Sequence, residues 1–181
     1  TCRDVASIHA ADAKFGRVAI NLSGAQFVEP NIVQELIKVM HFWEVPSSMI
    51  EFEITESMVM QDIELAIKHM DDLIDAGFTL SIDDFGTGYS SLAYLKRFPV
   101  NSVKIDRSFV QDMQSNNNDT AIVLAIVAMA RTLGLKVVAE GIETAQQLET
   151  LQGCHCDEYQ GFYFSKAVPI DELIHLLEKN K

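Results

Sequence analysis

Residues 78–88 read FTLSIDDFGTG, and this stretch decides the fold. Phe78–Ile82 is a short run of apolar and β-branched residues, which predicts a buried strand. Two carboxylates, Asp83 and Asp84, follow at once, and the glycines after them predict a tight turn into a helix. A strand that passes through a turn into a helix is the repeating unit of α/β folds with a parallel sheet.

The same unit recurs on both sides of this stretch. Short β-rich runs alternate with segments in which apolar residues follow the helical period. The strands that we expect are Arg17–Leu22, Met49–Ile54, Phe78–Ile82, Ser102–Ile105, Leu135–Ala139 and Glu158–Phe164. The helices that we expect are residues 1–13 or part of them, Asn31–Trp43, Asp62–Ala76, Asp119–Leu133, a helix capped by Thr144 with Gln147, and Asp171–Lys179.

This alternation predicts an α/β fold whose parallel strands are joined by right-handed crossovers. Two architectures fit this alternation: an open, doubly wound sheet and a TIM-like (β/α) barrel. An eight-unit barrel typically needs about 250 residues, whereas this chain has 181. A barrel would therefore be incomplete here, with about six strand–helix units.

The composition is that of a globular domain, with 48% apolar and 22% charged residues. Lys and Arg number 14 and Asp and Glu number 26, which gives a formal charge of −12. Such a charge argues against DNA or RNA as a partner, because coating nucleic acid requires a basic face. It leaves room for a nucleotide that is held through metal ions.

Three cysteines are present, an odd and sparse number that predicts no disulfide framework and suits a reducing compartment. Cys154 and Cys156 flank His155, but no second pair of ligands at the usual spacing accompanies them. We therefore expect no zinc site. The longest apolar run is too short to span a bilayer.

Polar residues recur at or near the carboxyl ends of the expected strands, where α/β folds bind ligands. A single carboxylate before a helix is most often a cap, but six units that repeat the arrangement indicate a site. The residues in these positions are Asn21, Glu53, Glu56, Asp83, Asp84, Lys104, Asp106, Glu140, Glu143 and Gln160.

Clustered carboxylates repel one another and therefore need a cation. Oxygen ligands without His or Cys suit Mg²⁺, Mn²⁺ or Ca²⁺. The adjacent pair Asp83 and Asp84 could serve two metal ions, as in phosphodiester hydrolysis. Lys104 could then supply a positive charge to a phosphate oxygen or to a metal-bound hydroxide.

Six motifs in order resemble those of EAL domains, which are phosphodiesterases of the bacterial second messenger cyclic di-GMP. They are VAINLS (18–23), EFEITES (51–57), SIDDFGTGYSSLAYL (81–95), VKIDRSF (103–109), VVAEGIET (137–144) and YQGFYFS (159–165). The resemblance runs from about Val18 to Pro169. It implies a (β/α)₈-like barrel whose first strand is antiparallel to its neighbours. It also implies two Mg²⁺ or Mn²⁺ ions and hydrolysis to linear pGpG.

The resemblance also implies residue roles. Asn21, Glu53 and Asp83 would hold the first metal, Asp83 would bridge, and Asp84 would hold the second. Lys104 would orient the attacking water, and Glu140 would act as a base or as a ligand through water. The supporting residues would be Asp106 in the water network, Gln160 lining the site, and Glu143. Glu56 and the DFGTG turn, which contains Thr87, would form the loop that couples the metal site to dimerisation.

The Glu-Ala-Leu tripeptide that names this family is absent from the 181 residues. In the family it precedes the motif around Asn21 and supplies a ligand of the first metal. We therefore expect residues 1–181 to be a single EAL-type domain that lacks its N-terminal strands. Two explanations compete: the chain is a fragment of an intact enzyme, which the retained metal and lysine positions favour, or it is a shortened chain that no longer catalyses. The alternatives are a catalytically inactive cyclic di-GMP sensor, or an unrelated metal-dependent α/β enzyme such as an aldolase.

The resemblance finally implies partners and a location. We expect a homodimer that forms through the helix starting near Ser90. Independently of the resemblance, missing strands would expose two sheet edges, so we expect either self-association through that gap or an added N-terminal segment. An upstream sensory or GGDEF domain is expected in the parent protein. The expected location is the cytoplasm, including the case of a cytoplasmic part of a membrane-anchored parent.

Overall fold

The computed structural model describes residues 1–10, 15–87, 92–113 and 117–179. Within them, six strands form one sheet in chain order, and every neighbouring pair is parallel. The expectation of a parallel sheet is thereby confirmed. The strands are β1 (Val18–Asn21), β2 (Ile50–Thr55), β3 (Thr79–Phe85), β4 (Ser102–Ile105), β5 (Lys136–Ala139) and β6 (Glu158–Tyr159).

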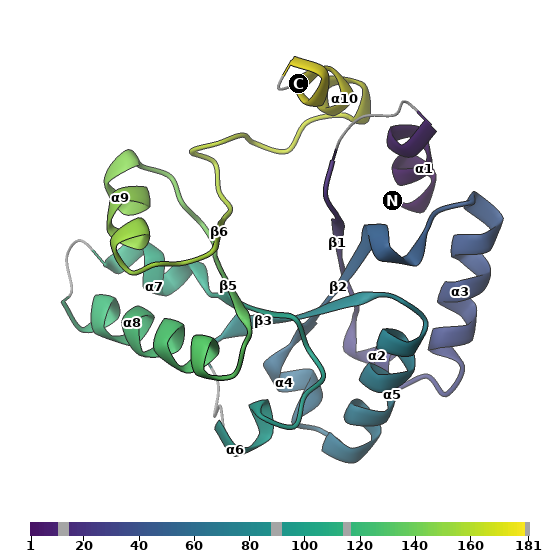
Figure 1. The fold of residues 1–181 in the computed structure, drawn as a ribbon, viewed down its shortest axis with the longest axis horizontal. Coiled ribbons are helices and arrows are strands. Elements are labelled where there is room, and N and C mark those ends of the chain that lie inside the picture. Colours follow the sequence, from purple (N-terminus) through teal and green to yellow (C-terminus); the bar gives the residue numbers. More distant parts are fainter. Residues whose placement is uncertain (11–14, 88–91, 114–116, 180–181) are drawn as a thin grey trace.

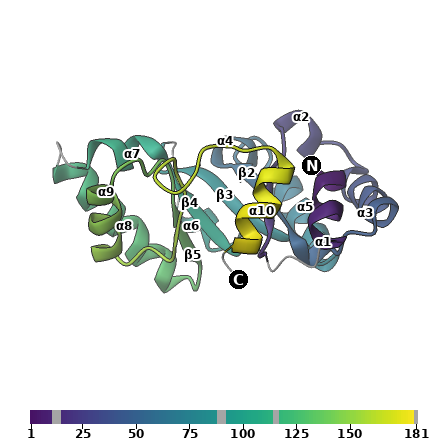
Figure 2. The same cartoon turned by 90° about the horizontal axis from the view of Figure 1, so that it is seen from above.

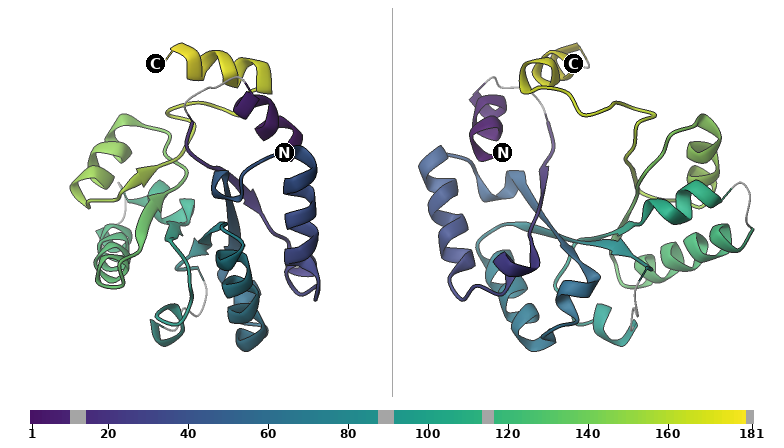
Figure 3. Two further views of the ribbon diagram at one scale, coloured as in Figure 1. Left: turned by 45° about the vertical axis from the view of Figure 1, so that its right-hand side comes forward. Right: turned by 180° about the vertical axis from the view of Figure 1, so that it is seen from behind.

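The sheet curls, and the crossover helices cover its outer, convex side (Figures 1 and 3). Strands β1 and β6 are its two edges and do not pair with each other, so the sheet forms an incomplete TIM-like barrel. The helices are α1 (Cys2–Ala10), α2 (Gly24–Phe27), α3 (Ile32–Trp43), α4 (Glu56–Val59), α5 (Ile63–Asp75), α6 (Leu92–Leu95), α7 (Arg107–Asp112), α8 (Asn117–Thr132), α9 (Ala145–Gly153) and α10 (Ile170–Lys179), with a 3₁₀ turn η1 at Ser47–Met49.

The ends of the helices follow the capping signals of the sequence. The carboxylate of Asp62 accepts a hydrogen bond from the amide of Leu65 and so caps α5. Gly77, just beyond that helix, has a φ of +87°, which an L-residue adopts only with strain. Thr144 and Gln147 form the expected capping box of α9.

The core lies between the outer face of the sheet and the helices. Successive side chains of a strand point to opposite faces, so Phe52 and Ile54 of β2 pack outward among buried apolar residues. The alternate residues Glu51 and Glu53 lie on the concave side of the curl, which we call the inner face. Two of the helices, α7 and α8, lie on the β5 side of the molecule, while α1, α3 and α5 lie on the β1 side (Figure 2).

The last strand is shorter than the sequence predicts. We expected Glu158–Phe164, but β6 ends at Tyr159, and the chain turns at Gly161. The side chains of Phe162 and Phe164 are 63% and 53% exposed, so the prediction of a buried strand is wrong here. The reason is a close approach between Gly161 and Ile142, described below. After this turn the chain continues to α10, which lies near α1 (Figures 1 and 3).

Ser90, where the expected dimerisation helix begins, lies outside the described residues, as do residues 11–14. Within the described part of the chain, no helix is both long enough and apolar enough to cross a bilayer.

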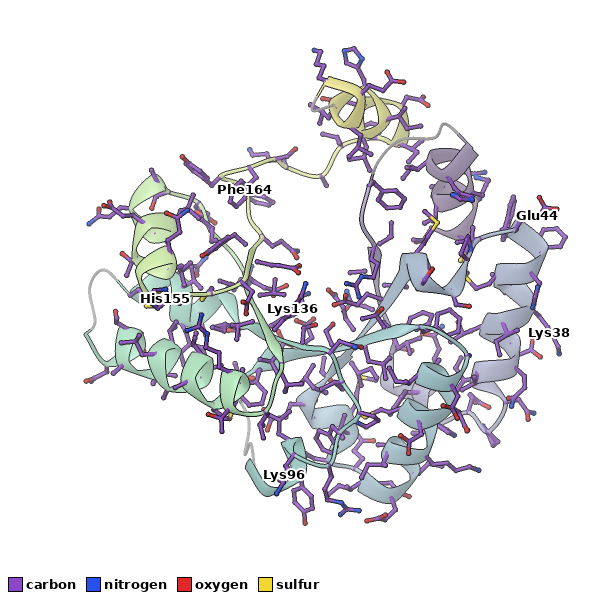
Figure 4. All side chains as sticks on the ribbon, viewed as in Figure 1. Lys38, Glu44, Lys96, Lys136, His155 and Phe164 are labelled. Carbon is purple, nitrogen blue, oxygen red and sulfur yellow. The ribbon has the colours of Figure 1, made fainter. Side chains whose placement is uncertain are left out.

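The thiols of Cys154 and Cys156 are buried beside His155, the turn residue labelled in Figure 4, whereas Cys2 is half-buried. Burial raises the pKa of the Cys154 thiol, and it raises the pKa of the Cys156 thiol to about 12. Because the thiolate is the reactive species, we expect a thiol-specific disulfide reagent at pH 8 to modify only Cys2 rapidly. The two buried thiols should react only after unfolding in guanidinium chloride. Three rapidly reacting thiols in the folded protein would contradict this packing.

Candidate active site at the carboxyl ends of the strands

The ammonium of Lys104 lies at the centre of a cluster of carboxylates on the inner face. It is 2.6 Å from Oε1 of Glu140 and 3.5 Å from Oδ1 of Asp83, and it also contacts Oε1 of Glu53. The Lys104 side chain is only 4% exposed. Four residues from four different strands or strand ends therefore meet at one point, as the sequence predicts.

The register of the sheet explains why they meet. Glu53 pairs with Asn21 on one side and with Ser81 on the other, while Asp83 pairs with Thr55. Lys104 lies one residue before the end of β4, and Glu140 directly follows β5. Because parallel strands end at the same edge of a sheet, side chains near these ends share one rim. Asn21 is adjacent to Glu53 in this register, with an exposed side chain.

A local irregularity in β3 accommodates two consecutive carboxylates at this rim. The register between β3 and β4 shifts between Ile82 and Phe85, and Asp84 has a φ of +53°. The amide of Asp84 donates to Oδ1 of Asp83 at 3.0 Å. The Thr87 hydroxyl donates to the carbonyl of Asp84 at 2.9 Å and so closes the turn. Asp83 and Asp84 thus both stay near Lys104, although they are neighbours in a strand.

The cluster binds protons more tightly than isolated side chains would. Burial, assisted by the charge of Asp83, raises the pKa of both Glu53 and Glu140 in spite of their contacts with Lys104. Burial alone would lower the pKa of Lys104, but its hydrogen bonds to Glu140 and Glu53 raise it above its ordinary value. For Glu53 and Glu140, burial outweighs the attraction of Lys104, whereas for Lys104 the neighbouring carboxylates outweigh burial.

Asp84 and Asp106 complete the acidic rim. Partial burial, followed by the charges of Asp83 and Asp106, raises the pKa of Asp84. Asp106 caps α7, because its carboxylate accepts hydrogen bonds from the hydroxyl and the amide of Ser108. Burial alone would raise the pKa of Asp106, but the hydrogen bonds from Ser108 lower it below its ordinary value.

Gln160 and Glu143 lie on the β6 side of the site. They line a cavity of about 200 Å³ together with Glu140 and Arg107. The amide of Gln160 donates to the carbonyl of Ala139 at 2.8 Å, and the Gln160 carbonyl accepts from the amide of Ile142 at 3.1 Å. These backbone bonds hold the chain around Glu140 and Gln160 in one arrangement.

Glu56 is not part of the cluster around Lys104. It begins α4 and is buried beside Ile82 and Phe85, whose side chains belong to the core on the outer face. Thr87 acts through the backbone of Asp84 and is exposed. Both residues lie behind or beside the rim rather than at its centre.

A second polar layer lies deeper on the inner face, and the sequence interpretation did not assign it a role. Arg17 donates to the hydroxyl of Thr79 at 2.8 Å, and the Ser102 hydroxyl donates to Oε1 of Glu51 at 3.2 Å. Lys136, labelled in Figure 4, pairs with Glu158 at 2.8 Å. The signal was a spacing of two residues, because Glu51, Ser102 and Glu158 precede the site residues Glu53, Lys104 and Gln160 by two.

The donor atoms at the rim suit a hard divalent cation. They are carboxylate and amide oxygens, which such cations prefer as ligands. When all carboxyls are ionised, the three carboxylates of Glu53, Asp83 and Glu140 face the single ammonium of Lys104, which leaves a net negative charge. In the part of the chain that the structure describes, no three Asp, Glu, His or Cys side chains are already arranged to hold a metal ion. The three carboxylates face the ammonium of Lys104 instead.

Known proteins are similar to this chain over nearly all of its length. The model of the EAL domain family matches residues 1–167. The cyclic di-GMP phosphodiesterase NbdA of Pseudomonas aeruginosa is 43% identical over 176 residues, which are 97% of this chain and 22% of that protein. The chain thus spans about a fifth of the length of this curated relative.

Solved structures are also similar to this chain over most of its length. The PaMucR phosphodiesterase in complex with c-di-GMP is 40% identical, with a TM-score of 0.91 over 95% of this chain and 70% of that one. Klebsiella pneumoniae BlrP1, in a complex with manganese and cyclic di-GMP, is 32% identical, with a TM-score of 0.81 over 90% of this chain and 42% of that one.

Proposed function

The chain belongs to the EAL domain family, and from this premise we propose that it hydrolyses one phosphodiester bond of cyclic di-GMP to give linear pGpG. The observation that carries the proposal is the convergence of Glu53, Asp83 and Glu140 on Lys104 at the carboxyl ends of the strands. A relative with a cyclic di-GMP phosphodiesterase name and another solved with this nucleotide support the substrate.

Divalent metal ions are part of this proposal, with Mg²⁺ or Mn²⁺ as the two ions of the site. Asn21, Glu53 and Asp83 would hold the first ion, Asp83 would bridge, and Asp84 would hold the second. The oxygen-only donor set and its surplus negative charge support this assignment. When bound, such ions make water acidic enough to attack at neutral pH and neutralise charge on the phosphate.

The chain's own groups would do the rest of the work. Lys104 donates hydrogen bonds from a buried position, so it can orient the attacking water and stabilise a negatively charged phosphate oxygen. Glu140 holds the Lys104 ammonium at 2.6 Å, and its raised pKa suits a group that accepts a proton from water. Asp106 fixes the start of α7 beside Asp84, and Gln160 and Glu143 line the cavity next to Glu140.

The remaining assignments are supporting roles. Glu56, buried behind β3, and Thr87, which closes the turn after Asp84, would together hold the carboxylates of Asp83 and Asp84 at the rim. Both residues would act through their neighbours, so we propose no contact of theirs with substrate.

The deciding experiment is incubation of the protein with cyclic di-GMP and Mg²⁺ or Mn²⁺, followed by chromatography of the products. We expect pGpG, and we expect none when the metal is chelated with EDTA. The Glu-Ala-Leu tripeptide is absent from these 181 residues, so the rate also measures whether the residues present suffice. Binding of the nucleotide without any pGpG would replace this proposal with that of a cyclic di-GMP sensor.

We further propose that the domain acts in the cytoplasm as a homodimer, and that a sensory or GGDEF segment precedes it in the parent protein. The free thiols of the three cysteines support a reducing compartment. Sedimentation velocity is expected to show a species of twice the mass of one chain at micromolar concentration. A monomer that persists when the concentration is raised a hundredfold would rule out the dimer, and cell fractionation tests the location.

A further inference from the structure

Lys104 occupies the position at which its carboxylate neighbours meet. Its ammonium contacts Glu53, lies 2.6 Å from Glu140 and lies 3.5 Å from Asp83. An ammonium can donate three hydrogen bonds, and here three carboxylates face it. The side chains of Glu53 and Asp83 are only 7% and 14% exposed, so water can reach little of either group.

The same two carboxylates are the ones that a first metal ion would need. The hydrogen bond from Lys104 to Glu53 and its ion pair with Asp83 at 3.5 Å engage carboxylate oxygens that a cation would otherwise bind. In addition, a positive ammonium this close to a divalent cation repels it through a partly desolvated medium. The two positive charges therefore cannot both interact fully with Glu53 and Asp83.

We propose that Lys104 is an internal counter-ion that competes with the divalent cation for Glu53 and Asp83, and that it thereby sets the cation affinity of the site. This inference rests on the proposed metal-dependent function and adds a second role to Lys104. Without metal, Lys104 holds the carboxylates together against their mutual repulsion. With metal, the cation takes Glu53 and Asp83, and Lys104 becomes free to act on water or phosphate.

Glu140 supplies the place to which Lys104 withdraws. It belongs to the chain after β5, on the side of Lys104 opposite to β2 and β3 in the strand order. Its oxygen already lies 2.6 Å from the ammonium, so this pair survives when the other two contacts are lost. Glu140 is in this respect a positioning residue for Lys104.

Lys136 provides a matched control. Lys136 also lies on the inner face of the sheet, but its side chain is 56% exposed and pairs with Glu158 at 2.8 Å. Its own contact is thus a solvent-exposed pair of small energetic weight. Removing its charge changes the net charge of the protein by the same amount as removing that of Lys104.

The test is a titration of the metal-free protein with Mn²⁺, followed by calorimetry and by the loss of the free-ion electron paramagnetic resonance signal. We expect Lys104→Met to bind Mn²⁺ at least about tenfold more tightly than the wild type, since a positive charge beside the site is gone. Lys136→Met should bind within about twofold of the wild type. Equal or weaker binding by folded Lys104→Met would overturn the inference.

The wild-type protein gives an independent measurement if Lys104→Met does not fold without metal. In protein labelled with ¹⁵N-lysine, the buried ammonium of Lys104 should give a side-chain signal whose protons exchange slowly with water, unlike exposed lysines. We expect this signal to shift and its exchange to accelerate by at least about tenfold on saturation with Mg²⁺, because two of its carboxylate contacts are lost. An unchanged signal at saturating Mg²⁺ would overturn the inference.

The outcomes separate the inference from the proposed function. A wild-type chain that binds no Mn²⁺ and yields no pGpG would overturn both. A wild-type chain that binds Mn²⁺ and yields pGpG, while folded Lys104→Met binds the ion no more tightly, would overturn only the competition between Lys104 and the cation.

Discussion

Glu53→Gln is expected to lower the rate of cyclic di-GMP hydrolysis by at least about 10²–10³-fold. The substitution keeps the size of a side chain that is only 7% exposed and replaces one carboxylate oxygen with an amide nitrogen. It removes a negative charge that both Lys104 and the proposed first metal ion require. Because the amide cannot carry this charge, the loss should appear in kcat as well as in the apparent affinity for Mg²⁺.

Glu64→Gln is the control with the same chemical change. Glu64 lies on α5, is 77% exposed and pairs with Arg97 at 2.7 Å on the outer side of the molecule. Its rate should stay within about twofold of the wild type, since exposed ion pairs contribute little. Circular dichroism would establish that both variants are folded. A folded Glu53→Gln protein with more than a tenth of the wild-type rate would remove Glu53 from the metal site.

Much of the site could be predicted because the apolar pattern of the sequence indicates where the strands lie and where they end. Glu53, Asp83, Lys104 and Glu140 each fall near the end of an apolar run, and parallel strands bring such ends to one rim. The structure confirms that these four side chains meet. Two of the helices could also be predicted: the helical period indicated Asp62–Ala76, and the capping box of Thr144 with Gln147 is present in the structure.

The arrangement inside the cluster could not be predicted from spacing. The choice of Lys104 as the centre depends on the register shift in β3 and on the positive φ of Asp84, which are properties of the folded sheet. The deeper layer around Glu51 and Ser102 escaped assignment because each of its residues alone looks like an ordinary strand position. These residues can be recognised as one polar layer only in the folded sheet, which places their strands side by side.

The end of β6 was predicted wrongly because a contact between distant residues overrides the local pattern. The sequence from 158 to 164 is rich in aromatic residues and indicates a strand. In the fold, the amide of Ile142 donates to the carbonyl of Gln160, and the amide of Tyr163 donates to the carbonyl of Ile142. These two hydrogen bonds, which we call the Ile142 clasp, turn the chain at Gly161. The periodicity of residues 158–164 carries no information about them.

Gly161→Ala is therefore expected to lower the free energy of unfolding by about 3 kcal/mol or more, which is at or beyond the upper end of the usual cost of overpacking. A Cβ at this position would lie 2.1 Å from the carbonyl oxygen and 2.3 Å from the amide nitrogen of Ile142. Both atoms belong to the backbone, so no side-chain rotation can relieve the contact. For a chain of this size such a loss corresponds to a melting temperature roughly 6–12 °C lower.

Gly153→Ala is the matched control, because Gly153 ends α9 and a Cβ there would meet nothing within 4 Å. Its stability should equal or slightly exceed that of the wild type, since Ala favours helix more than Gly does. The change at Gly161 should also reach the site, because the same clasp fixes Gln160 and the chain between Glu140 and Ile142. Urea unfolding curves of the three proteins measure the difference. Equal midpoints for Gly161→Ala and Gly153→Ala would show that the chain at Ile142 yields, and that the clasp does not hold Glu140 in place.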